Sequence, residues 1–281
     1  MHMKKQAIIR RFAQNTKGRD FVVGDLHGHL SALLRAMQQV GFDGARDRLF
    51  LTGDLSDRGE HSRECIDLLR LPGVYSVLGN HDVDLLDICA SKPSQEVIAR
   101  IANFFAKNGT RWWADTTPEE RAGFVEVLSE LPLAIEIETT RGTVGIIHGD
   151  VPAGMTWDQF VGALEQGYND VIECCLTGRD RLRRRDTSGV RGIGRVFVGH
   201  TPQWEGVTRL GNVYGIDTGA VFGLSIPGRP GVLTLADVQA RTTCLAEVQQ
   251  AVEGGYVRVV ELDTEVPGDF GNYVQEPGPR G

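Results

Sequence analysis

Five short apolar segments of this chain each run into a polar side chain of the kind that binds metal ions. We expect β-strands at 21–23, 48–52, 74–78, 144–147 and 195–199. The side chains that follow them are Asp25 and His27 in GDLHGH, Asp54 in GDLSDRG, Asn80 and His81 in GNHD, His148 in HGD and His200 in GHTP. Ligands of α/β sheets bind beyond the carboxyl ends of strands, so the sequence predicts that these side chains converge.

Each of these residues has an ordinary structural explanation when it is taken alone. An aspartate after a strand is most often a turn former or a helix cap, and a single histidine is most often a hydrogen-bonded structural residue. Independent structural roles would not recur in the same register at five strand ends. The repetition therefore favours a metal site over five unrelated turns.

The order of the apolar segments predicts an α/β fold. Helices are expected at 30–40 and 62–69, between the first three strands, which is typical of a parallel, layered core. Further strands are expected at 133–138, 213–216 and 232–235, with an edge strand near 256–263. Two β-sheets packed face to face and flanked by helices would accommodate all of them.

We expect one domain over residues 1–262. The helical patterns at 94–108 and 119–131 predict a small helical cap, over about 91–131, beside its core. Residues 263–281 are rich in glycine and proline, which is typical of a flexible tail.

Charge and composition narrow the class of protein. A net charge of −7 over 281 residues argues against a nucleic-acid binder that works through a basic surface. No run of apolar residues is long enough for a membrane helix, and the start lacks the pattern of a signal peptide. The five cysteines lack metal-ligand spacing and suit reduced thiols, so a cytoplasmic location is predicted.

The predicted ligand set favours particular metals. Imidazole, carboxylate and amide oxygen together suit manganese, iron or zinc better than calcium. Two such ions about 3.5 to 4 Å apart can share a carboxylate and lower the pKa of a shared water to near neutrality. The same ions would neutralise phosphate oxygens, which explains how an acidic chain could hold an anion.

The motifs GDLHG, GDLSDRG, GNHD, HGD and GHTP resemble, in order and spacing, the phosphoprotein phosphatase family of calcineurin-like metallophosphoesterases. The resemblance is to the bacterial and bacteriophage lambda branch, and it covers roughly residues 19–235. It implies two packed mixed β-sheets flanked by helices. It also implies a metal-dependent serine/threonine protein phosphatase that hydrolyses phosphomonoesters of phosphoproteins or phosphopeptides by direct attack of a metal-bridging hydroxide.

The resemblance implies a ligand set for two divalent ions, with manganese favoured and iron or zinc as alternatives. Asp25 and His27 would bind the first ion, and Asp54 would bridge both. The second ion would be completed by Asn80, His148 and His200.

The resemblance also assigns roles around the metals. His81 would be the general acid, oriented by Asp57. Arg58 would grip the phosphate oxygens, and Asn80 would also contact phosphate. A second phosphate arginine is expected after the cap.

Arg179 in LTGRDR is the best candidate for that second arginine. Thr177 and Gly178 stand where the lambda branch commonly has Trp-Ser, so Arg181 and Arg183 stay open as alternatives. The basic run at 179–186 is either a solvated helix face or a rim that attracts phosphorylated substrates.

Other features leave alternatives open. Asp82 replaces the glutamate usual in the family and is typical of related diadenosine tetraphosphatases, so a dinucleoside polyphosphate hydrolase is the rival function. A non-catalytic, metal-binding module that docks phosphoproteins is a third. The segment RWW at 111–113 either packs the cap on the core or forms an aromatic wall of the site. The sequence predicts no oligomeric state.

Overall fold

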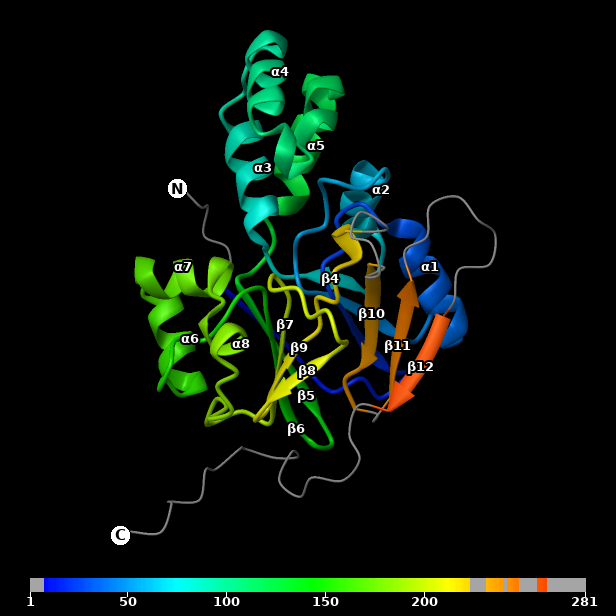
Figure 1. Ribbon diagram of the computed structural model, residues 1–281, viewed down its shortest axis with the longest axis vertical. Coiled ribbons are helices and arrows are strands. Elements are labelled where there is room, and N and C mark those ends of the chain that lie inside the picture. The colour runs from blue at the N-terminus through cyan, green and yellow to red at the C-terminus, as the bar shows by residue number, and fades with distance from the viewer. Residues whose placement is uncertain (1–7, 223–230, 240–241, 248–256, 262–281) are drawn as a thin grey trace.

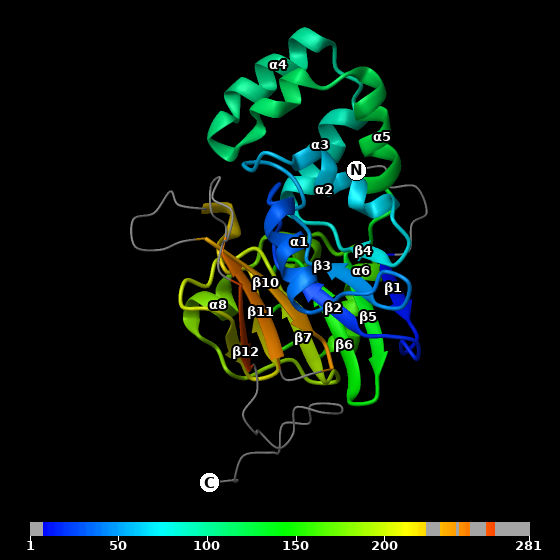
Figure 2. The same ribbon diagram turned by 90° about the vertical axis from the view of Figure 1, so that its right-hand side faces the viewer.

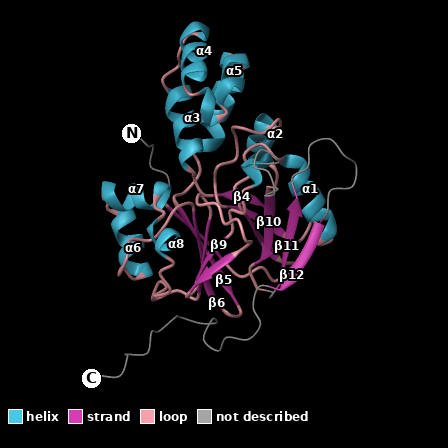
Figure 3. Cartoon of the chain, viewed as in Figure 1, coloured by secondary structure: helices cyan, strands magenta, loops and turns pink. Residues whose placement is uncertain are grey.

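Two six-stranded β-sheets form the body of the protein in the computed structural model, which describes residues 8–222, 231–239, 242–247 and 257–261 (Figure 1, Figure 3). The first sheet, in spatial order, consists of β1 (Ile9–Phe12), β5 (Ala134–Thr139), β6 (Gly142–Ile147), β7 (Arg195–Val198), β9 (Val213–Gly215) and β8 (Thr208–Leu210). The second consists of β12 (Val257–Glu261), β11 (Thr242–Glu247), β10 (Val232–Asp237), β2 (Asp20–Val23), β3 (Arg48–Leu51) and β4 (Val74–Ser76).

Helices flank the two sheets and extend from one end of them. Beside the second sheet lie α1 (Leu30–Gln39), which packs on β10 and β11, and α2 (Ser62–Asp67). Beside the first lie α6 (Trp157–Glu165), α7 (Asn169–Thr177) and α8 (Asp180–Arg184). A cap stands at one end in both Figure 1 and Figure 2, and it contains α3 (Asn80–Ala90), α4 (Gln95–Phe104), η3 (Thr110–Asp115) and α5 (Pro118–Leu128). Short 3₁₀ helices are η1 (Leu68–Arg70), η2 (Ala106–Asn108) and η4 (Ala220–Phe222).

The central strands are apolar because both of their faces are covered. Val22 and Phe50 point between the sheets, where they join Phe197 of the other sheet in one cluster. Val23 and Leu51 belong to the larger cluster that includes residues of the flanking helices. Strands buried on both faces read as continuous apolar runs, and this is why the sequence pattern could find them.

Parallel pairing aligns the strand ends from which the polar side chains emerge. In the second sheet, β2 and β3 are parallel, with Val23 opposite Leu51. In the first sheet, β6, β7 and β9 are parallel, with Ile147 opposite Val198 and Val198 opposite Gly215. The carboxyl ends within each parallel set therefore lie side by side, as the strand-end pattern requires.

The predicted fold class is confirmed, and the edge strand expected near 256–263 is β12 at the end of its sheet. The sequence pattern missed β1, β8 and β11, which are short or carry polar residues. It also missed α3, which begins at Asn80 itself.

The predicted tail at 263–281 lies outside the described residues, and the domain limits at 1–262 stay a prediction. In the described ranges, no helix is long and apolar enough to cross a membrane.

One buried carboxylate ties the end of β3 to the start of α3. Asp82, in the first turn of α3, accepts hydrogen bonds from the backbone N–H groups of Asp54 (2.8 Å), Leu55 (3.1 Å) and Gly79 (2.9 Å). Its side chain is fully buried, so water cannot replace these bonds. The positions of Asp54 and of the helix that carries Asn80 therefore depend on this aspartate.

We predict that Asp82→Ala lowers the free energy of unfolding by about 3 kcal/mol or more, because it strands three buried N–H donors. Asp87→Ala is the matched control, since Asp87 is an exposed carboxylate on the same helix. Its effect should stay within about 0.5 kcal/mol. Denaturant unfolding followed by circular dichroism measures both; equal effects of the two substitutions would contradict this account of Asp82.

Candidate metal centre

Polar side chains that follow the parallel strands of both sheets lie together at one pocket of about 340 Å³. Those that line it are Asp25 and His27 after β2, Asp54 after β3, Asn80 at the start of α3 and His200 after β7. His148, which follows β6, is fully buried and lies against Asp54 and Asn80. The structure thus brings together all six residues of the predicted ligand set.

Asp54 stands between two groups of imidazoles. Its Oδ2 lies 3.4 Å from Nε2 of His27, and its Oδ1 lies 3.4 Å from Nε2 of His148. Two sets of three potential ligand atoms, each set within 4.8 Å, share this aspartate: one adds His27 and His81, and the other adds His148 and His200. One carboxylate between two donor groups is the arrangement that a pair of cations requires.

The two imidazoles that face Asp54 are each oriented by a hydrogen bond from the other ring nitrogen, Nδ1. Nδ1 of His27 lies 2.9 Å from the carbonyl oxygen of Ser56, and Nδ1 of His148 lies 2.7 Å from that of Thr52. A carbonyl only accepts, so each Nδ1 carries a proton and each Nε2 is directed at Asp54. Metal-binding histidines are commonly oriented by this kind of bond.

Asp25 lies outside both three-residue groups but belongs to the same pocket. Its Oδ1 accepts a hydrogen bond from Oγ1 of Thr52 (3.0 Å), and its Oδ2 accepts one from the backbone N–H of His200 (2.9 Å). Oδ1 is also 4.0 Å from Nδ1 of His148. A side chain in place of Gly199 would clash with this carboxylate, so glycine is required there.

The buried carboxylates create a strongly negative environment. Burial first, and then the charge of Asp217, raise the pKa of Asp25 well above its usual range. Burial alone would lower the pKa of His148, but the charges of Asp54 and Asp25 outweigh it and raise that pKa to about 10. The negative charge of Asp54 and Asp25 that raises this pKa would equally favour a cation beside them. The donor set and its charge therefore fit divalent cations.

Five residues of this region adopt left-handed backbone conformations, with φ between 42° and 72°. They are His27, Asp54, Asp57, Arg58 and His200. Such conformations cost of order 1–3 kcal/mol each in residues other than glycine and persist where the surroundings enforce them. Here hydrogen bonds hold them, including the bond from the N–H of His27 to the carbonyl of Asp54 (2.9 Å). Of the five, His27, Asp54, Arg58 and His200 line the pocket, whereas Asp57 is fully buried beside His81.

A second group of side chains stands beside the ligand cluster. Nδ1 of His81 lies 2.6 Å from Oδ2 of Asp57. The guanidinium of Arg58 lies 3.2 Å from Nε2 of His81 and 3.4 Å from Nε2 of His27. Burial would lower the pKa of His81, but the charge of Asp54 and the bond to Asp57 outweigh it and raise that pKa.

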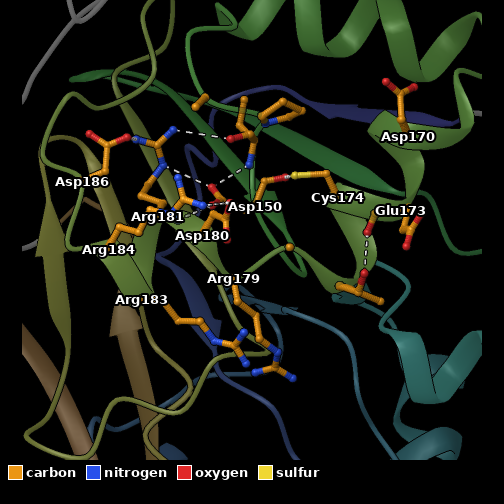
Figure 4. A pocket seen from close by; sticks show the side chains of 15 residues that line it. Asp150, Asp170, Glu173, Cys174, Arg179, Asp180, Arg181, Arg183, Arg184 and Asp186 are labelled. Atoms are coloured by element: carbon orange, nitrogen blue, oxygen red, sulfur yellow. Dashed lines mark hydrogen bonds and ion pairs between the residues drawn. The ribbon is translucent and has the colours of Figure 1, made fainter.

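The three candidate arginines after the cap lie in different environments. Arg179 lines the pocket and donates from NH1 to the carbonyl oxygen of His200 (2.6 Å). Arg181 is buried and forms ion pairs with Asp150 (3.1 Å) and Asp186 (3.4 Å). Figure 4 shows these pairs on one side of a neighbouring cavity, while Arg179 and Arg183 extend together in another direction.

His200 is oriented by its other ring nitrogen than the imidazoles of His27 and His148. Its Nε2 lies 3.1 Å from the carbonyl oxygen of Thr177, so Nε2 carries the proton, and Nδ1, which lies 3.5 Å from NH2 of Arg179, is the nitrogen that could bind a metal. Burial, followed by the charges of His148 and Arg179, lowers the pKa of His200 to about 3. The ring is therefore neutral, as metal binding requires.

Sequence reasoning assigned no role to Asp217, which lines the pocket beside Asp25. It directly follows the expected strand at 213–216, so the same strand-end pattern could have found it. Reasoning from sequence also missed the indole N–H groups of Trp112 and Trp113, which both donate to Asp57. Side-chain bonds between distant segments have no signal of this kind in a single sequence.

Comparison with known proteins places these motifs in a family. The family model described as calcineurin-like phosphoesterase matches residues 21–217. Serine/threonine-protein phosphatase 1 of Salmonella typhimurium (strain LT2) is 32% identical over 241 residues, which is 84% of this chain and the whole of that protein. The symmetrical bis(5'-nucleosyl)-tetraphosphatase of Methylococcus capsulatus (strain Bath) is 29% identical over 58% of this chain and 61% of that protein.

A solved structure agrees at the level of fold. A protein serine/threonine phosphatase from Saccharomyces cerevisiae superposes with a TM-score of 0.54, at 16% identity, over 94% of this chain and 86% of that one. The family match spans the strands and strand ends that form the candidate site, and the full-length similarity to the Salmonella protein extends beyond it. The chain belongs to the calcineurin-like phosphoesterase family, whose members use a binuclear divalent metal centre.

Proposed function

We propose that this phosphoesterase removes phosphate from serine and threonine side chains of proteins. The observation that carries the proposal is the position of Asp54, with one carboxylate oxygen facing His27 and the other facing His148. Support for a protein substrate comes from the relative named serine/threonine-protein phosphatase 1, which this chain matches over that protein's whole length.

Each group of side chains has a distinct task in this proposal. Asp25, His27, Asp54, Asn80, His148 and His200 would hold two divalent cations, with manganese favoured over iron or zinc. Such cations supply positive charge for the phosphate oxygens and an activated water. Arg58, Arg179 and Asn80 all line the pocket, where the two guanidinium groups and the amide would bind phosphate oxygens.

His81 completes the proposed mechanism as the general acid. Its Nδ1 is held by Asp57, so Nε2 is the nitrogen that faces Arg58 and the pocket. As the ester P–O bond breaks, its electron pair stays on the seryl or threonyl oxygen, which takes the proton from Nε2. The oxygen of the attacking water ends on phosphate, and no phosphoenzyme forms.

A dinucleoside polyphosphate hydrolase is the second candidate, and one feature of the pocket favours it. A cavity of about 730 Å³ adjoins the candidate site and shares Arg179 with it. Arg183 is exposed there, and its charge is close enough to lower the pKa of Arg179, although burial of Arg179 contributes more. A row of phosphates could extend from one arginine to the other. The similarity to a tetraphosphatase and the presence of Asp82 agree with this candidate.

We predict that chelation abolishes hydrolysis and that added Mn²⁺ restores it. Asp54→Asn should lower kcat by at least about a hundredfold, because an amide cannot supply two anionic oxygens to two cations. Asp87→Asn serves as the control for an exposed carboxylate of α3. Metal content by mass spectrometry and kcat on p-nitrophenyl phosphate are the measurements. Full activity of metal-free protein would exclude the proposed chemistry, and metal binding without hydrolysis would favour a docking module.

We predict that phosphoserine and phosphothreonine peptides have higher kcat/KM than diadenosine tetraphosphate. The physical reason is that the phosphate of a monoester can be bound within the pocket that Arg58 and Arg179 line, whereas the phosphates of the dinucleotide would have to extend from it toward Arg183. Rates of phosphate release and of nucleotide formation compare the two substrates. A higher kcat/KM for the dinucleotide, lowered selectively by Arg183→Gln, would favour the second candidate.

We predict that Arg179→Gln lowers activity, whereas Arg181→Gln lowers stability. Arg179→Gln should lower kcat/KM for p-nitrophenyl phosphate about tenfold to a hundredfold, since it removes a phosphate-binding guanidinium. Arg181→Gln should lower the free energy of unfolding by about 3 to 5 kcal/mol, because Asp150 would lose its buried partner. Kinetics and denaturant unfolding of both variants provide the test, and the reverse pattern would move the phosphate role to Arg181.

A further inference from the structure

Asp57 is a buried carboxylate whose two oxygens have separate partners. Oδ2 lies 2.6 Å from Nδ1 of His81. Oδ1 accepts two hydrogen bonds, from the indole Nε1 of Trp112 (2.8 Å) and of Trp113 (2.9 Å). Asp57 is 0% exposed, so the protein must provide the bonds that water would otherwise make.

The indole donors match what this oxygen can accept. An indole N–H only donates, and a carboxylate oxygen has two lone pairs for two donors. Oδ1 is thereby occupied on both sides, which leaves Oδ2 for the imidazole of His81. The carboxylate cannot rotate without losing two hydrogen bonds to a charged group, and these are among the stronger bonds in proteins.

The cap holds the two indoles in place. Both belong to η3, and Trp113 is only 2% exposed. The ring of Trp112 packs edge-on against Phe124 of α5, with centroids 5.7 Å apart. The guanidinium of Arg63 lies 5.7 Å from the same ring. The contacts of Trp112 and the burial of Trp113 restrict the movement of both rings.

The segment just before the indoles contacts the neighbour of Asp57. The carbonyl oxygen of Gly109 accepts a hydrogen bond from the backbone N–H of Arg58 (3.2 Å). A side chain at Gly109 would clash with Arg58, so only glycine permits this approach. Asp57 and Arg58 have φ angles of 72° and 69°, which are unfavourable without such external contacts.

We propose that Trp112 and Trp113 are positioning residues for the general acid, so that the cap is part of the catalytic apparatus. The two indoles hold Asp57, Asp57 holds the imidazole of His81 through Nδ1, and Nε2 is thereby kept facing the leaving oxygen. The inference rests on the proposed role of His81 as the acid. It goes beyond that role by assigning the orientation of the acid to a segment some thirty residues away, in the cap.

The test compares substrates whose leaving groups differ in their need for a proton. Trp112→Phe and Trp113→Phe each keep an aromatic ring but remove the donor. Each should lower kcat about tenfold on a phosphoserine peptide and on phenyl phosphate, since a hydrogen bond to a charged group is lost. On 2,4-dinitrophenyl phosphate, whose leaving group departs without a proton, kcat should change by less than about twofold. KM should stay within about twofold on all three substrates.

Trp157→Phe is the matched control. Trp157 is also 2% exposed and donates its indole N–H, to Glu136 at 2.7 Å, but it lies outside the site. It should leave the ratio of the rates on the two aryl substrates unchanged. Circular dichroism and metal content verify that each variant is folded and loaded. Trp112 is less buried than Trp113, so Trp112→Phe still provides the test if Trp113→Phe does not fold.

His81→Asn separates this inference from the function on which it rests. Combined with His81→Asn, Trp112→Phe should cause no further loss on phenyl phosphate, because the indole acts through His81. If His81→Asn slows hydrolysis of phenyl phosphate but not of 2,4-dinitrophenyl phosphate, while the tryptophan variants slow all substrates equally, the positioning role is wrong and the acid role stands. If His81→Asn itself lacks leaving-group selectivity, both are overturned.

Discussion

The position of the Asp54 carboxylate is the constraint on which the candidate site depends. One oxygen faces His27, which follows a strand of the second sheet, and the other faces His148, which follows a strand of the first. Oδ1 also accepts the backbone N–H of His81 at 3.0 Å, and the N–H of Asp54 itself is held by Asp82. A single side chain thereby joins both sheets and the first turn of the cap, so the packing of the sheets sets the separation between the two groups of ligands.

Electrostatics explains why such a cluster is suited to cations. Asp25, Asp54 and Asp217 are all buried close to one another, and burial of like charges is unfavourable without compensation. The imidazole of His148 responds with a raised pKa, and burial raises the pKa of Asp217 to about 6. Two divalent ions would supply the missing positive charge. The same ions would allow a chain whose formal net charge is −7 to bind phosphate.

The cap contributes more than a cover for the core. Its 3₁₀ segment directs two indole N–H groups at Asp57, and the carbonyl of Gly109 binds the backbone of Arg58. Of the two expectations for the RWW segment, the structure supports packing within the cap, and neither Trp112 nor Trp113 lines the pocket of the candidate site. The tryptophans pack within the cap and also contact a residue that holds His81. The proposed acid, His81, and the proposed phosphate-binding residue, Arg58, are therefore both connected to the same short stretch of the cap.

The sequence alone determined the sheet strands that carry the site and the six side chains that converge, because both follow from local pattern. A strand buried on both faces must be apolar, and a parallel set aligns whatever follows each strand. Short polar strands such as β1 lack this signal, since their stability comes from pairing with β5. Only tertiary structure decided which arginine faces the pocket. Arg179 and Arg181 are two residues apart, yet one lines the site and the other is buried against Asp150. That choice, like the bonds from Trp112 and Trp113 to Asp57, depends on which distant segments meet in space, and no local periodicity encodes it.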